Sequence, residues 1–104
     1  MSRRIRLVAG LSALVFSGAC GDRCDTLCAE LSRRLAECRG DELTWADLGA
    51  RNRADFAQGC RSDWERQRAD LDGWEIELAL IECGDAHEVL DELTCDEVRA
   101  LYAP

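Results

Sequence analysis

Cysteine content is the feature of this sequence that most restricts its fold. Seven cysteines occur within 104 residues, and six of them lie between residues 24 and 95. This density in a short chain is typical of exported domains whose small hydrophobic core is reinforced by disulfides. The fold class therefore depends on whether the chain leaves the reducing cytosol.

The first nineteen residues predict export. Residues 1–6 are basic, residues 7–16 form an apolar run of ten, and the small residues 17–19 precede Cys20. These are the three regions of a secretory signal peptide. Ten apolar residues are too few to cross a bilayer, which needs about 20. We therefore expect a signal peptide at residues 1–19.

Residues 15–20 read Val-Phe-Ser-Gly-Ala-Cys. The match of Gly18, Ala19 and Cys20 resembles the lipobox of bacterial lipoproteins, in which the cysteine becomes the lipidated first residue. An acylated Cys20 would also leave six cysteines, an even number that can all pair. We expect residues 20–104 to form one lipid-anchored domain, with ordinary cleavage and free secretion as the alternative.

Charge restricts the partners of this domain. Beyond residue 19 the chain has ten arginines, no lysine and 21 acidic side chains, a net charge of −11. Such a surface repels nucleic-acid phosphates and offers no polybasic attraction to anionic lipid. The expected partners are therefore the membrane, through the lipid anchor, and an envelope protein, but no nucleic acid.

Apolar residues at helical spacing predict an all-α bundle of four to five disulfide-stapled helices. The expected helices cover residues 22–39, 52–71, 72–84, 85–93 and a last segment from residue 94. Their expected capping residues are Asp22, Asn52, Asp72 and Thr94. The helix at 72–84 is apolar on nearly all sides, so we expect it at the centre, ending at Gly84.

Three cysteines lie on one stripe of the first helix. Cys38 is about 21 Å from Cys24 and about 15 Å from Cys28 along that helix, whereas a disulfide needs Cα atoms within about 7 Å. Cys24 and Cys28 point the same way, which strains a bond between them. Each should therefore bond to a different partner among the remaining three, which are Cys60, Cys83 and Cys95.

Hairpin geometry narrows the pairing further. Cys28 and Cys60 have their midpoint at residue 44, inside the first interhelical loop, as an antiparallel hairpin requires. If the third helix runs parallel to the first, Cys83 comes near Cys38. If the fourth helix then returns, Cys95 comes near Cys24. The expected pairs are Cys24–Cys95, Cys28–Cys60 and Cys38–Cys83. The closest alternative bonds Cys60 to Cys83 across the turn at residues 71–73.

Candidate catalytic and metal sites are weak in this sequence. Six paired cysteines leave no thiolate nucleophile, and the single His87 is not linked by any motif to Ser32 or Ser62. The Cys24-x3-Cys28 spacing is not that of a zinc knuckle. We therefore expect no enzymatic activity, no metal and no cofactor.

Tryptophans are the candidate binding residues. Trp64 and Trp74 lie on stripes expected in the core, whereas Trp45 lies in the irregular segment 41–51 and is the expected exposed partner-binding residue. The sequence thus predicts a non-enzymatic exported lipoprotein, acting as a structural or protein-binding module at the cell envelope. Its cysteine number and helix content also resemble those of saposins, which implies a lipid binder. A secreted inhibitor that presents segment 41–51 is a further alternative.

Overall fold

Helices account for most of residues 21–102, the part of the chain that this computed structural model describes. They are α3 (Arg23–Cys38), α4 (Arg53–Ala69), α5 (Gly73–Glu92) and α6 (Cys95–Ala100). Within these residues there is no strand, so the predicted all-α class is confirmed. The predicted signal peptide and the lipidation site at Cys20 lie outside the described residues.

Every described helix begins at its predicted cap. In α3, α5 and α6 the cap side chain accepts a hydrogen bond from the amide three residues on, and the carboxylate of that residue accepts one from the cap amide. Each such capping box satisfies amides that would otherwise lack a partner at the helix end. The caps are Asp22 for α3, Asn52 for α4, Asp72 for α5 and Thr94 for α6.

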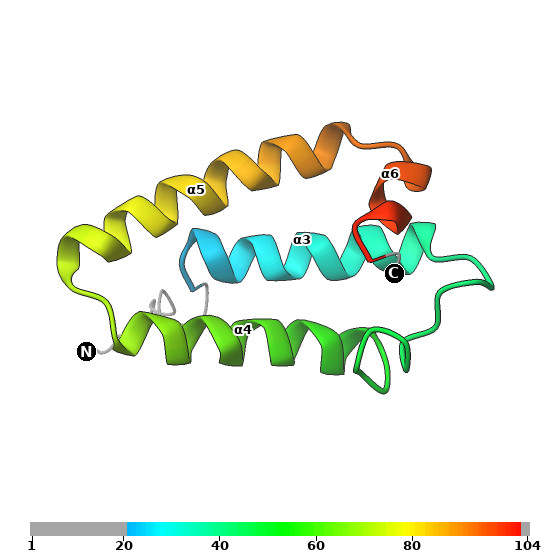
Figure 1. Cartoon of the computed structure of the whole chain (residues 1–104), viewed down its shortest axis with the longest axis horizontal. Coiled ribbons are helices and arrows are strands. Elements are labelled where there is room, and N and C mark those ends of the chain that lie inside the picture. The colour runs from blue at the N-terminus through cyan, green and yellow to red at the C-terminus, as the bar shows by residue number, and fades with distance from the viewer. Residues whose placement is uncertain (1–20, 103–104) are drawn as a thin grey trace, which may run out of the picture.

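Helix α3 is the centre of the bundle. Figure 1 shows α4 running antiparallel along one side of α3 and α5 running parallel along the other, with α6 beside the carboxyl-terminal end of α3. Helix α3 packs against all three, whereas α4 and α5 hardly touch each other. The prediction of a central helix beginning after Asp72 is therefore wrong, because that helix lies at one edge.

The predicted helix end at Gly84 is also wrong. Helix α5 continues through Gly84 to Glu92, so the segments 72–84 and 85–93 form one helix. A single interior glycine costs only about 1 kcal/mol relative to alanine, too little to break a helix that packs along its length. A Cβ atom at Gly84 would lie 3.5 Å from the side chain of Arg23 on α3, which shows how closely the two helices approach.

This continuous helix changes two of the three predicted disulfides. The structure contains Cys24–Cys83, Cys28–Cys60 and Cys38–Cys95, with Cα–Cα distances of 5.1, 5.7 and 4.9 Å. The Cys28–Cys60 prediction is confirmed, whereas Cys24–Cys95 and Cys38–Cys83 are wrong. Because α5 does not reverse, Cys83 lies level with the start of α3 and Cys95 with its end. The sequence separations of 59 and 57 are nearly equal, as two parallel segments require.

The buried core lies at the end of the bundle where α6 packs. Leu35 of α3 and Val98 of α6 are completely inaccessible, and Leu90 from the last part of α5 completes the cluster beside Cys38. The Arg99 guanidinium donates a hydrogen bond to the Cys38 carbonyl and so ties α6 to the end of α3. A core this small depends on its disulfides for stability.

We predict that peptide mapping of the oxidised protein will show Cys24 linked to Cys83 and Cys38 linked to Cys95. Trypsin combined with a protease that cleaves before aspartate separates Cys24 from Cys28 and Cys83 from Cys95, so mass spectrometry of the unreduced digest can distinguish the pairings. Reduction of the same digest is the control. Linked peptides joining Cys24 to Cys95 would contradict the parallel arrangement of α3 and α5.

Candidate functional site

An apolar cleft runs along α3, with lining residues from α4 and from the end of the chain beyond α6. Its volume is about 450 Å³, within the range of pockets that enclose small ligands. Two disulfides, Cys24–Cys83 and Cys28–Cys60, form part of its wall. The large apolar and aromatic side chains that line it are Leu27, Leu31, Leu48, Phe56, Trp64 and Tyr102.

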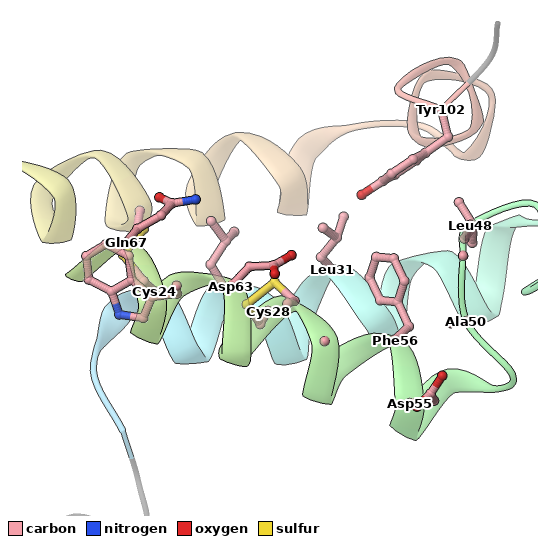
Figure 2. A pocket seen from close by; sticks show the side chains of 16 residues that line it. Cys24, Cys28, Leu31, Leu48, Ala50, Asp55, Phe56, Asp63, Gln67 and Tyr102 are labelled. Carbon is pink, nitrogen blue, oxygen red and sulfur yellow. A yellow bond between two sulfur atoms is a disulfide. The ribbon is translucent and has the colours of Figure 1, made fainter. Parts of the chain in front are cut away.

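The side chains of the cleft come from elements far apart in the sequence. Leu31 rises from α3, Phe56 from the first turns of α4, and Tyr102 from the segment after α6, as Figure 2 shows. The rings of Phe56 and Tyr102 lie edge to face, with centroids 6.3 Å apart, an arrangement that aromatic pairs favour. Burial raises the pKa of the Tyr102 phenol, so this wall stays neutral at physiological pH.

Trp45 lies behind this aromatic wall. It is half-buried, packs against the core, and its ring centroid is 5.9 Å from that of Phe56. The Arg39 guanidinium covers its ring at 5.3 Å. Trp45 is therefore not the exposed residue expected from the sequence. The Asp47 carboxylate accepts a hydrogen bond from the Thr44 amide and the Thr44 hydroxyl accepts one from the Asp47 amide, and the resulting turn directs the ring inward.

At the opposite end of the cleft, Asp22 holds Trp64 in place. The Trp64 indole donates to both carboxylate oxygens of Asp22, at 2.9 and 3.1 Å, and Arg68 contacts the same carboxylate at 3.1 Å. Burial of Asp22 favours its neutral form, but hydrogen bonds from the indole and from the Asp25 and Cys24 amides outweigh this effect and lower the pKa of Asp22. The cap of α3 thus also fastens the end of α4.

The charged groups at the cleft are acidic. Among the described residues that line it, Asp55 and Asp63 are the only charged ones, and their ion-pair partners, Arg51 and Arg66, are not part of the lining. An anionic ligand would meet two carboxylates there and no cation. The cleft therefore suits an apolar group whose polar end is neutral or positively charged.

The candidate catalytic residues do not come together. All six described cysteines are in disulfides. Ser32 is buried and donates its hydroxyl to the Ala29 carbonyl, whereas Ser62 lies on α4 with a hydrogen bond from Gln58. Neither serine has His87 as a hydrogen-bond partner among the described residues, so no Ser–His pair of the kind that activates a hydroxyl forms there.

His87 instead belongs to a cluster that joins α5 to α3. Ligand atoms of Glu30, His87 and Asp91 lie within 4.8 Å of one another. The Arg33 guanidinium contacts both Glu30 oxygens and lowers the pKa of Glu30 to about 2, while the hydrogen bond shared with Glu30 raises the pKa of Asp91. Arg33 is thus the main charged partner of Glu30 in this cluster, which also contains the contact between His87 and Asp91.

Comparisons with known proteins add no further assignment. No protein-family model, curated protein or solved structure matches this chain. In the described part of the chain, no helix combines the length and apolar character needed to cross a bilayer. Function must therefore be inferred from the cleft and the surfaces of the bundle.

Sequence analysis did not foresee the cleft. Its apolar residues, such as Leu27, Leu31 and Phe56, occupy positions of the helical stripes that ordinarily form a closed core. They remain half-buried because α4 and α5 hardly touch. The one available signal was the placement of three cysteines on a single helix, which predicts that the other helices attach to it rather than to one another.

We predict that Asp22→Ala will lower the free energy of unfolding by about 1–3 kcal/mol, because it removes a helix cap and leaves the Trp64 indole without its acceptor. Asp22→Asn should lose less, since asparagine is also a good cap. Because the pKa of Asp22 is lower in the folded protein than the ordinary value of 3.8, the ionised carboxylate stabilises the fold at pH values above 3.8. This stabilisation disappears as the pH falls below 3.8. The Asn variant should therefore lose less stability than the wild type between pH 5 and pH 3.

Urea unfolding followed by circular dichroism at these pH values measures both effects. Asp70→Ala is the matched control, because Asp70 is exposed and its side chain makes no hydrogen bond among the described residues. An Asp22→Ala loss no larger than that of Asp70→Ala would contradict the role assigned to Asp22.

Proposed function

We propose that this protein is a non-enzymatic, exported binding module of the cell envelope, which receives an apolar helix of a partner protein in the α3 cleft. The observation that carries this proposal is the open apolar lining along α3. Helices α4 and α5 each pack mainly against α3 and hardly touch each other, which leaves this lining uncovered. In a helical bundle, such an opening is the position that a further helix fills.

The dimensions of the cleft agree with a short helical segment. Its lining on α4 extends from Asp55 to Gln67, which is about 18 Å, or just over three turns, at the helical rise. Side chains of a partner helix at positions i, i+3 or i+4, and i+7 would enter it. Two disulfides hold this wall in place before binding, which reduces the ordering cost of association.

Lipid binding is the second candidate function, and the apolar lining supports it. An acyl chain would make the same contacts with Leu27, Leu31 and Phe56. The acidic rim formed by Asp55 and Asp63 disfavours a free fatty acid or an anionic headgroup, which leaves lipids with neutral or cationic headgroups. The protein partner is favoured because the cleft is open along its length and matches a helix of three turns.

Photo-crosslinking from Gly59 tests this proposal. Gly59 lines the cleft on α4, and no atom lies within 4 Å of where its Cβ would be, so the first carbon of a benzoylphenylalanine side chain has room there. In cells that export the full chain, we expect a crosslink from position 59 to an apolar helical peptide of another envelope protein. The same group at exposed Gln58, outside the cleft, is the control and should give no such adduct.

The mass of the adduct separates the two functions. A peptide adduct specific to position 59 supports the protein-binding module, and an adduct with the mass of a lipid replaces it with the lipid binder. Equal adducts from positions 58 and 59, or none from either, would overturn the assignment of the cleft as a binding site.

The proposed membrane attachment is a lipid on Cys20. This residue lies two positions before Asp22, the cap of α3, so an anchor there would hold the bundle close to the bilayer surface. We predict that intact-mass measurement of membrane-fraction protein will show a chain that begins at Cys20 and carries acyl groups. Cys20→Ser should release the domain from the membrane fraction. An unmodified thiol at residue 20 of the wild type would contradict the anchor.

A further inference from the structure

Helix α5 exposes an apolar stripe on the side that faces away from α3. Trp74, Leu78 and Ile81 are 68%, 41% and 52% exposed, and their spacing of four and three residues places them on one helix face. The prediction that Trp74 lies in the core is therefore wrong, because α5 lies at the edge of the bundle. Single exposed apolar side chains are common, but a continuous stripe containing a tryptophan is typical of an interaction site.

The charges around this stripe are all of one sign. Helix α5 contains no arginine or lysine, and its seven carboxylates are Glu75, Glu77, Glu82, Asp85, Glu88, Asp91 and Glu92. Those bordering the stripe are exposed and form no ion pair within residues 21–102. Helices α3, α4 and α6, in contrast, carry acidic groups paired with arginines three or four residues away. The negative charge of the outer face of α5 is therefore uncompensated.

We propose that this outer face, formed by Trp74, Leu78 and Ile81 and their bordering carboxylates, docks a cationic amphipathic helix of a partner protein. An apolar ridge flanked by lysine or arginine would bury the stripe and neutralise the carboxylates together, and complementary charge speeds and selects such encounters. A second copy of this chain would bring two acidic borders together, and an anionic bilayer would be repelled in the same way.

This surface is separate from the cleft. Of the residues of α5, only Cys83 lines the cleft, and it lies on the face bonded to α3 rather than on the outer face. Docking at the outer face thus neither requires nor blocks a segment in the cleft, and the two can be tested independently.

The test uses the oxidised protein and a fluorescent 14-residue peptide of leucine and lysine, with the leucines on one helical face. We expect saturable binding, followed by fluorescence anisotropy, that weakens as salt is raised. Trp74→Ser or Ile81→Ser should weaken binding by about tenfold, as loss of a central interface residue does. The double change Glu77→Gln and Glu82→Gln should weaken binding and reduce its dependence on salt.

Two matched controls show whether the site is specific. Leu101→Ser changes an apolar side chain that is also 57% exposed but lies after α6, away from α5, and it should leave binding unchanged. The pair Asp41→Asn and Glu42→Gln removes two exposed carboxylates from the loop after α3 and should also have no effect. Phe56→Ala, which removes an aromatic side chain from the cleft, should bind the peptide normally, so failure of one proposal is distinguishable from failure of the other.

Several results would overturn the inference. One is a loss of binding with Leu101→Ser equal to that with Trp74→Ser. A second is equal affinity for a peptide with glutamate in place of lysine. A third is flotation of the delipidated protein with phosphatidylglycerol vesicles that is lost with Trp74→Ser. A fourth is sedimentation of the wild type as a dimer that Trp74→Ser converts to a monomer. Circular dichroism of each variant checks that α5 is intact. We expect unchanged spectra, because the substituted side chains of α5 are exposed.

Discussion

The attachment of every other described helix to α3 by a disulfide is the constraint on which this structure depends. Cys28 bonds to α4, Cys24 to the middle of α5, and Cys38 to the first residue of α6. In the chain-entropy account, bridges across loops of this length contribute about 4 kcal/mol each, which is large beside the marginal stability of a small domain. Because the disulfides supply this stabilisation, the outer helices do not need to pack against one another.

Both candidate binding surfaces follow from this arrangement. A central helix with neighbours that do not pack against each other stays open between them, as at Leu27 and Leu31 of α3, and each neighbour is covered on one side only. The inner face of α4 lines the cleft together with Tyr102, which follows α6, and the outer face of α5 carries Trp74. In a bundle closed by hydrophobic packing alone, these apolar groups would have to be buried, whereas here the disulfides allow them to remain available to partners.

The polar groups of the chain are largely committed to structure. Asp22 caps α3 and holds Trp64, and Glu30 is bound by Arg33 within the cluster that includes His87. The low pKa of Glu30 is thus explained by its ion pair with Arg33. Structural ion pairs commonly shift pKa values in this way without any catalytic role. Most carboxylates of α5 form no ion pair within residues 21–102, and they shape a surface of the bundle.

What the sequence determined by itself was local. The starts of the helices follow from caps such as Asp72 and Thr94, which act on amides within three residues, and the Cys28–Cys60 bond follows from the midpoint of one hairpin. The tertiary structure alone decided that α5 continues through Gly84, because packing along α3 outweighs the small helical penalty of one glycine. That single outcome sets the other two disulfides, places Trp74 outside, and opens the cleft, since all three depend on which helix lies at the centre.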